Sequence, residues 1–206
     1  PGAFDGGRGL RGKQARQRFI VFGEEDLPLL AECQHCPHGQ SVHADGDGDL
    51  NLYVVSGGYL FEEKDPLLQD RLYLNDGQAN FKTSISGLPR ETLAGSRVAV
   101  IDIDSDGDLD LFVGTRFVPG KYPISSPNML LVNDGKGNFA NAIATLSPAL
   151  ENLGMVCDVV AEDINKDGKK DLIILGEWMA IKIFTTLNNT LVDESEKWFS
   201  ASTKGW

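Results

Sequence analysis

The chain has 206 residues, an ordinary apolar content of 41% and a formal net charge of −11 at pH 7. This length supports one sizeable hydrophobic core or two small ones. The acidic balance argues against nucleic-acid binding, which needs a basic surface. The sequence also lacks a run of about 18 apolar residues, so we expect no membrane span.

Residues 1–40 fit the pattern of the rest of the chain poorly. They carry the one basic cluster, between Arg8 and Arg18, which we interpret as a flexible tail. The three cysteines, Cys33, Cys36 and Cys157, are an odd number, which excludes a fully paired disulfide framework within one chain. For "CQHCPHGQSVH" (33–43) a zinc site, a local disulfide and free thiols all remain open.

The stretch "DIDSDGDLDL" (102–111) places an aspartate at every second position. Such closely spaced carboxylates repel one another unless a cation binds them. Gly107 stands where a sharp turn needs a residue that is free in φ. The order matches loop positions 1, 3, 5, 7 and 9 of a site for a hard cation, usually Ca²⁺, with position 7 contributing its backbone carbonyl. The predicted ligands are Asp102, Asp104, Asp106, Asp108 (carbonyl) and Asp110.

The same order occurs twice more, in "DINKDGKKDL" and "HADGDGDLNL", 61 residues after and 59 residues before the first loop. In the 43–51 loop a histidine replaces the first aspartate, and imidazole is a poor ligand for a hard cation. We therefore predict up to three Ca²⁺ ions, with the 43–51 loop the weakest. The further ligands are Asp163, Asn165, Asp167, Lys169 (carbonyl), Asp171, His43, Asp45, Asp47, Asp49 (carbonyl) and Asn51.

An EF-hand does not fit these loops. Its position 12 is a glutamate and its flanks are helices, whereas position 12 here is Val54, Val113 or Ile174. The flanking segments, such as "VAVID" and "LDLFVG", are short, rich in β-branched residues and partly alternating, which indicates strands. Each loop therefore joins two strands.

Each repeat continues with a second pair of strands. "NDGQANF" and "NDGKGNF" lie between apolar runs and have the composition of hairpin turns, as does "TLNNTLV" in the third repeat. One unit thus reads strand, metal loop, strand, variable loop, strand, tight hairpin, strand. Four antiparallel strands in about 60 residues predict a β-propeller blade, which buries its faces only by stacking on neighbouring blades.

These motifs resemble the VCBS / FG-GAP-like repeat, which is related to the blades of integrin α-subunit propellers. "GEWMAIKIF" and the terminal "TKGW" resemble more narrowly the bacterial VCBS-repeat proteins that end in an ASPIC/UnbV domain. The resemblance covers residues 41–206 and implies an all-β chain of about three four-stranded antiparallel blades, part of a seven-bladed propeller with Ca²⁺ between the first and second strands. "RFIVFG" (18–23) is a candidate last strand of a preceding blade.

"KGW" (204–206) aligns with "LGM" (153–155), where the third blade begins. We therefore expect the chain to be a piece of a longer protein that stops as a fourth blade would start. Uncovered blade faces predict self-association, or dependence on further sequence.

Functionally we expect a calcium-stabilised, non-catalytic binding or scaffold module. Calcium sites of extracellular affinity would be empty in the cytosol, so we expect an extracellular, cell-surface or periplasmic location. The alternative is a piece of a secreted carbohydrate-active enzyme, a lyase or hydrolase, although the sequence offers no distinct acid/base pair outside the loops. The partner would be a protein or a glycan.

The connections after the second strands, 57–70 and 115–128, are long for hairpins and lie on the face opposite the metal loops. We expect a cluster there of Tyr59, Phe61, Arg116, Tyr122 and Trp178, for which packing between blades is the alternative interpretation.

Overall fold

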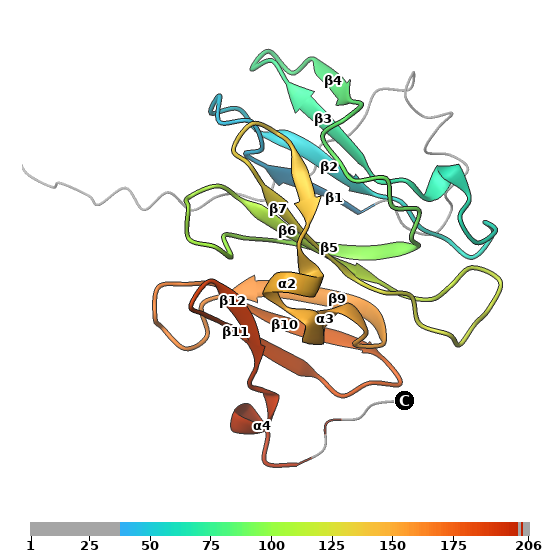
Figure 1. Cartoon of the computed structure of the whole chain (residues 1–206), viewed down its shortest axis with the longest axis vertical. Coiled ribbons are helices and arrows are strands. Elements are labelled where there is room, and N and C mark those ends of the chain that lie inside the picture. Colours follow the sequence, from blue (N-terminus) through green and yellow to red (C-terminus); the bar gives the residue numbers. More distant parts are fainter. Residues whose placement is uncertain (1–37, 202, 204–206) are drawn as a thin grey trace, which may run out of the picture. The chain divides into compact units, whose positions relative to one another are not determined.

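The computed structural model describes residues 38–201 and residue 203. They belong to one compact unit, residues 33–206. The basic cluster, "RFIVFG", Cys33, Cys36 and "KGW" lie outside the described residues. Within the described part, twelve strands form three four-stranded antiparallel sheets, each in simple sequential order (Figure 1). The predicted all-β fold of propeller blades is confirmed.

We call the sheets blades 1, 2 and 3. Blade 1 contains β1 (His38–Val42), β2 (Asn51–Val55), β3 (Arg71–Asn75) and β4 (Phe81–Ser84). Blade 2 contains β5 (Gly95–Ile101), β6 (Asp110–Thr115), β7 (Met129–Asn133) and β8 (Phe139–Asn141). Blade 3 contains β9 (Met155–Glu162), β10 (Asp171–Glu177), β11 (Lys182–Leu187) and β12 (Thr190–Asp193). Blade 1 thus begins at His38, slightly before the boundary expected at residue 41.

Four short helices complete the described elements. They are η1 (Pro66–Leu68), α2 (Ile143–Leu146), α3 (Pro148–Glu151) and α4 (Ser195–Trp198). The sequence does not predict these helices, because segments of three or four residues are too short to show helical periodicity. Helices α2 and α3 connect blade 2 to blade 3 and bury Ile143 and Leu150 in the core between these blades.

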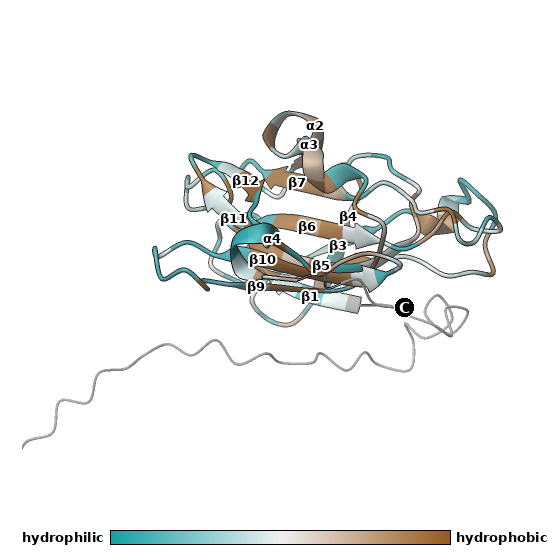
Figure 2. Cartoon of the chain, turned by 90° about the horizontal axis from the view of Figure 1, so that it is seen from below, coloured by the Kyte–Doolittle hydropathy of each residue, from teal (hydrophilic) through white to brown (hydrophobic). Residues whose placement is uncertain are grey.

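The first strands of successive blades, β1, β5 and β9, are neighbours, so the blades stack face to face. Two apolar cores lie between them. Tyr53 and Leu72 of blade 1 belong to the first core, and Phe112 and Leu130 of blade 2 belong to the second. Blade 2 is therefore covered on both faces, which is why β6 is buried at every position. Figure 2 shows this apolar character concentrated on the strands, with hydrophilic loops around them.

A buried carboxylate joins the strands of blade 1. Both Asp70 oxygens accept hydrogen bonds, one from the Tyr53 hydroxyl at 2.6 Å and one from the Ser56 amide at 2.6 Å. Burial raises the pKa of Asp70 to about 7, although both hydrogen bonds favour the ionised form. These two hydrogen bonds hold the C-terminal end of β2 and the start of the segment that follows it.

Among the described residues, no helix is both long and apolar enough to cross a membrane.

Candidate metal centres and pocket

Each predicted metal loop joins the first and second strands of its blade, as the sequence indicated. The 43–51 loop connects β1 to β2, the 102–110 loop connects β5 to β6, and the 163–171 loop connects β9 to β10. Gly48, Gly107 and Gly168 at position 6 have φ of 93°, 95° and 90°. A side chain is strained at such angles, so the glycine in each loop is required by the turn.

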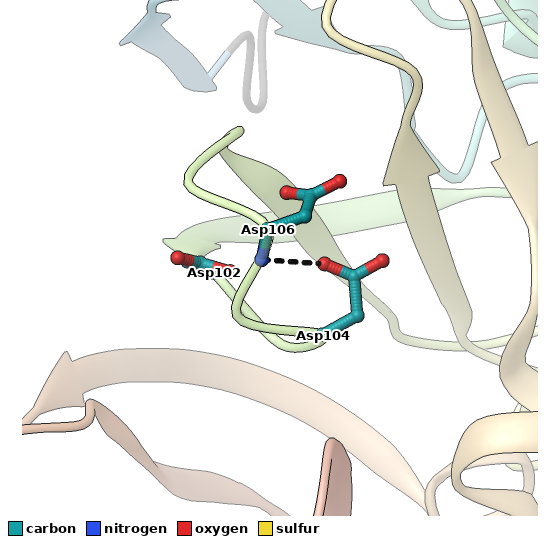
Figure 3. A group of neighbouring side chains, drawn as sticks. All are labelled: Asp102, Asp104 and Asp106. Atoms are coloured by element: carbon teal, nitrogen blue, oxygen red, sulfur yellow. Dashed lines mark hydrogen bonds between the residues drawn. The ribbon is translucent and has the colours of Figure 1, made fainter.

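The 102–110 loop brings three carboxylates together (Figure 3). One oxygen from each of Asp102, Asp104 and Asp106 lies within 4.8 Å of the others, a grouping that no other acidic cluster among residues 38–201 and 203 matches. The backbone shapes the cluster, because Asp104 accepts from the Asp106 amide at 3.3 Å and Asp106 accepts from the Asp108 amide at 2.8 Å. Burial and the neighbouring Asp106 raise the pKa of Asp104. This is the charge crowding that a cation would relieve.

One oxygen of this cluster provides a test of the fit to a cation. Oδ1 of Asp102 is buried and has no hydrogen-bond partner within the protein. A buried, unpaired carboxylate oxygen carries a large desolvation cost, so it needs a ligand. Such an oxygen is satisfied by a hydrogen-bond donor or by a cation, and the neighbouring Asp104 and Asp106 carboxylates offer no donor when ionised. The donor set is entirely oxygen, as Ca²⁺ prefers, and the residues present therefore fit a calcium ion.

The 163–171 loop uses its carboxylates differently. Both oxygens of Asp163 accept backbone hydrogen bonds, from Asp167 at 3.1 Å and from Gly168 at 3.0 Å. The Asn165 amide donates to Asp167 at 2.9 Å. The loop thus satisfies part of its own charge, which fits a site weaker than the 102–110 loop.

The 43–51 loop closes with protein groups at the places where a cation would bind. Nδ1 of His43 lies 3.2 Å from the Asp49 carbonyl oxygen, which is the oxygen predicted to bind the ion. When Nδ1 carries the proton, it donates a hydrogen bond to this oxygen. The Asn51 amide donates to Asp45 at 3.0 Å. A nitrogen group therefore lies beside two of the oxygens predicted to bind the cation, and the low affinity of this loop stays a prediction.

Position 9 has a role that the sequence analysis did not anticipate. Asn51, Asp110 and Asp171 are all fully buried. Each accepts a hydrogen bond from the backbone near the end or middle of the third strand, at Asn75, Asn133 and Thr186 respectively. These side chains therefore tie the end of the loop to the third strand of the blade. The sequence does contain a signal for this role. Position 9 keeps a side-chain acceptor oxygen in all three loops, even in the 43–51 loop, where histidine replaces the aspartate at position 1.

The second oxygen of position 9 distinguishes the loops. In blades 2 and 3 it accepts from the backbone amide at position 2, Ile103 at 2.9 Å and Ile164 at 3.1 Å. Burial raises the pKa of Asp110 to about 6 and also raises that of Asp171. With both oxygens of Asp110 already accepting backbone hydrogen bonds, this residue supports the loop as well as being a candidate ligand.

The hairpins beside the loops follow one design. Asp76 and Asp134 each accept two backbone hydrogen bonds within their turn, and an asparagine four residues later donates to their second oxygen at 2.9 Å. Asn133 also donates across the blades to the Ala44 carbonyl at 3.0 Å. The metal loop of blade 1 therefore lies against the hairpin of blade 2.

The opposite face carries a pocket of about 390 Å³ that continues into a more open depression. Segments from all three blades line it: Gly57–Tyr59 after β2, Ala94–Arg97 at the start of β5, Arg116 and Phe117 after β6, Cys157 on β9 and Glu177 at the end of β10. Cys157 is a free thiol, partly buried. The pocket therefore spans all three blades.

The predicted cluster of large side chains forms here, with one exception. Arg116 pairs with Glu177, the Tyr122 hydroxyl lies 3.3 Å from Glu177, and the Trp178 indole donates to Tyr122 at 3.2 Å. Tyr59 lines the pocket and is 56% exposed, and Trp178 is 65% exposed. Phe61 instead packs over Gly58, and neither Phe61 nor Trp178 is among the residues that line the pocket or the depression.

The comparison with known families bears on the first two blades. Residues 44–113 match the model of the FG-GAP-like repeat family. The matched segment begins at the second residue of the 43–51 loop and ends within β6, so it contains the rest of that loop, β2 to β5 and the whole 102–110 loop. No curated protein matches the chain. The resemblance to the FG-GAP-like repeat is thus supported over this segment, and blade 3 has the same order of strands and loops.

Proposed function

We propose that this chain is a calcium-stabilised, non-catalytic binding or scaffold module of an extracellular, cell-surface or periplasmic protein. The observation that carries the calcium assignment is the buried, unpartnered Oδ1 of Asp102 beside Asp104 and Asp106. FG-GAP-like repeats, which residues 44–113 match, are typical of propeller modules that bind or present partners.

The calcium energetics support the location. Extracellular calcium modules bind with Kd of about 10⁻⁴ to 10⁻³ M. At about 1 mM Ca²⁺ and a Kd of about 10⁻⁴ M, one site adds roughly 1.4 kcal/mol to the free energy of unfolding. Cytosolic calcium would leave such sites empty and their carboxylates repelling. Within the repeat class, "GEWMAIKIF" supports the bacterial VCBS type associated with ASPIC/UnbV domains.

The enzyme alternative, a secreted carbohydrate-active propeller, is the weaker one. Its acid would have to come from the pocket, where Glu177 is paired with Arg116 and hydrogen-bonded to Tyr122. A general acid or base acts best with a pKa near the working pH and without a permanent cation beside it. A turnover screen on polysaccharides with Glu177→Gln as control would separate the two functions.

Two alanine substitutions at the same loop position test the calcium proposal. Asp104→Ala should remove one calcium from the stoichiometry measured by titration calorimetry, because Asp104 supplies one of the three carboxylate oxygens that lie within 4.8 Å of one another. Asp45→Ala should leave the stoichiometry unchanged, since Asp45 already accepts from Asn51. If both variants lose a site of the same affinity, the ranking of the loops is wrong, and if the parent chain takes up no calcium, the proposal fails.

We place the binding function at the pocket face. Trp178 has a φ of 60°, in the left-handed region that costs a non-glycine residue roughly 1–2 kcal/mol. The fold gains little from this residue, because its ring is mostly exposed. An exposed aromatic ring held at a strained backbone position is the arrangement expected of a contact residue rather than a packing residue.

Trp178→Gly should separate binding from stability. Relief of the positive φ should keep the melting temperature equal to that of the parent or raise it, while retention on arrays of immobilised oligosaccharides and peptides should be lost. Trp198→Ala, on α4 and 42% exposed in the parent, is the matched control for removal of an exposed tryptophan. Unchanged retention of Trp178→Gly, or a marked loss of stability, would show that Trp178 has a packing role instead.

A further inference from the structure

Blade 3 exposes an apolar face that corresponds to the buried faces of blades 1 and 2. We define the terminal face as Val160, Ile173, Leu175, Leu187 and Val192. Val160 is 45% exposed, Leu175 38%, Leu187 52% and Val192 39%. Ile173 is half-buried, and helix α4 contacts β11. Singly exposed apolar residues are normal, but four exposed and one half-buried on the same sheet face are not.

Strand register shows what this face is equivalent to. In blade 1, Tyr53 pairs with Leu72, and both are buried against blade 2. In blade 2, Ala99, Phe112 and Leu130 lie side by side at the equivalent positions and are buried against blade 3. The same row in blade 3 is Val160, Ile173 and Ile183. Ile173 thus repeats a position, that of Tyr53 and Phe112, which a neighbouring blade covers twice within this chain, whereas Ile183 is already buried in blade 3.

The two existing interfaces share a size rule at one pair of positions. At the first interface Val55 of β2 meets Gly95 of β5, where an added Cβ would lie only 2.3 Å from the valine Cγ1. At the second interface the sizes are exchanged: Gly114 of β6 meets Val156 of β9, with a Cβ on the glycine only 2.5 Å from the valine Cγ1. One side is large and the other is glycine each time, because two side chains do not fit.

The repeat interval assigns the corresponding position on the terminal face. Val55, Gly114 and Leu175 occupy the same place in β2, β6 and β10, and Gly95 and Val156 occupy the same place in β5 and β9. Blade 3 therefore offers a large residue, Leu175, where blade 2 offers a glycine.

We propose that the terminal face docks a further four-stranded blade of this repeat type whose first strand carries glycine opposite Leu175. The partner is selected by size: a blade with valine at that position, like blade 3 itself, clashes with Leu175. Val160 and Ile173 supply the apolar contact, as Ala99 and Phe112 do in blade 2. The inference does not depend on calcium or on the pocket.

A graft tests the size rule. In the sequence, Trp206 aligns with Met155, so a residue placed after it corresponds to Val156 and to Gly95. Residues 95–147, a copy of blade 2 that starts with the required glycine, are attached after Trp206 of the full chain. The matched graft carries Gly95→Val in the copy only. Each graft is also combined with Leu175→Gly, which completes a two-by-two set.

The glycine graft on the parent chain should raise the melting temperature by roughly 5 °C or more and remove hydrophobic-dye binding. The valine graft should do neither on the parent but should dock on Leu175→Gly, which recreates the pairing of Gly114 with Val156. Equal melting temperatures of the two grafts on the parent would overturn the size rule. The ungrafted chain is the control for self-association: a dimer that Val160→Asp dissociates would identify a second copy as the occupant and overturn the proposal.

Discussion

Removal of calcium should lower the melting temperature of this chain by roughly 6–12 °C. The two stronger loops, 102–110 and 163–171, together add about 3 kcal/mol at about 1 mM Ca²⁺ and a Kd of about 10⁻⁴ M. For a chain of this size, 1 kcal/mol shifts the melting temperature by about 2–4 °C. The loss arises because Asp102, Asp104 and Asp106 then repel one another around a buried oxygen without a partner.

Thermal denaturation in chelator, followed by addition of metal, measures this effect. Ca²⁺ should restore the melting temperature, whereas Mg²⁺ should restore little, because it requires a tighter octahedral site. Asp45→Ala should show the same shift as the parent, since the 43–51 loop is closed by its own N–H groups. Superimposable melting curves with and without chelator would mean that calcium does not stabilise the fold.

The blades were predictable because their signals are local and repeated. Alternating β-branched segments on either side of each loop specify the first two strands, and Asn-Asp-Gly specifies the hairpin between the last two. Three copies at nearly constant spacing then fix the order of the strands. The short helices α2 and α3 were missed because "AIATLSPALEN" (142–152) carries no extended periodicity.

The supporting role of position 9 was not predictable from the loop itself. Asp110 accepts from the Asn133 amide, 23 residues away, and Asn51 accepts from the Asn75 amide, 24 residues away. Such partners become neighbours only once the third strand pairs with the second. From the carboxylate spacing alone, position 9 could equally well be a ligand that faces the ion and makes no hydrogen bond to the third strand.

The size rule at the blade interfaces was likewise not predictable from the sequence. Val55 with Gly95 and Gly114 with Val156 lie 40 and 42 residues apart, and glycines within strands are more often interpreted as bulges. Only the stacked blades show that each glycine accommodates a valine from the neighbouring sheet.

Asp110→Ala should be the most destabilising substitution in the metal loops, lowering the free energy of unfolding by about 3–5 kcal/mol. It leaves two amides without partners, those of Ile103 and Asn133, each now bonded to Asp110 at 2.9 Å. Both lie in the buried part of blade 2, where an unmet donor costs about 1–3 kcal/mol, and the lost side chain leaves a small cavity as well. Urea denaturation of the variant and parent measures the difference.

Asp108→Ala is the matched control, because its side chain is only partly buried and its predicted ligand atom is the backbone carbonyl. It should change the free energy of unfolding by no more than about 1 kcal/mol. The cost of Asp110→Ala should persist in chelator, since the two hydrogen bonds do not need the ion. If the cost disappears in chelator, Asp110 acts through the ion alone.

Asp110→Asn should fall between these two variants. Its carbonyl oxygen still accepts from Asn133, but its amide would face the Ile103 amide, donor against donor. Blade 1 tolerates Asn51 at this position because the group facing the Asn51 amide there is the Asp45 carboxylate, an acceptor. Two factors therefore decide between aspartate and asparagine at position 9. One is whether the second polar atom of the side chain faces an N–H or an oxygen, and the other is the charge needed to bind the ion.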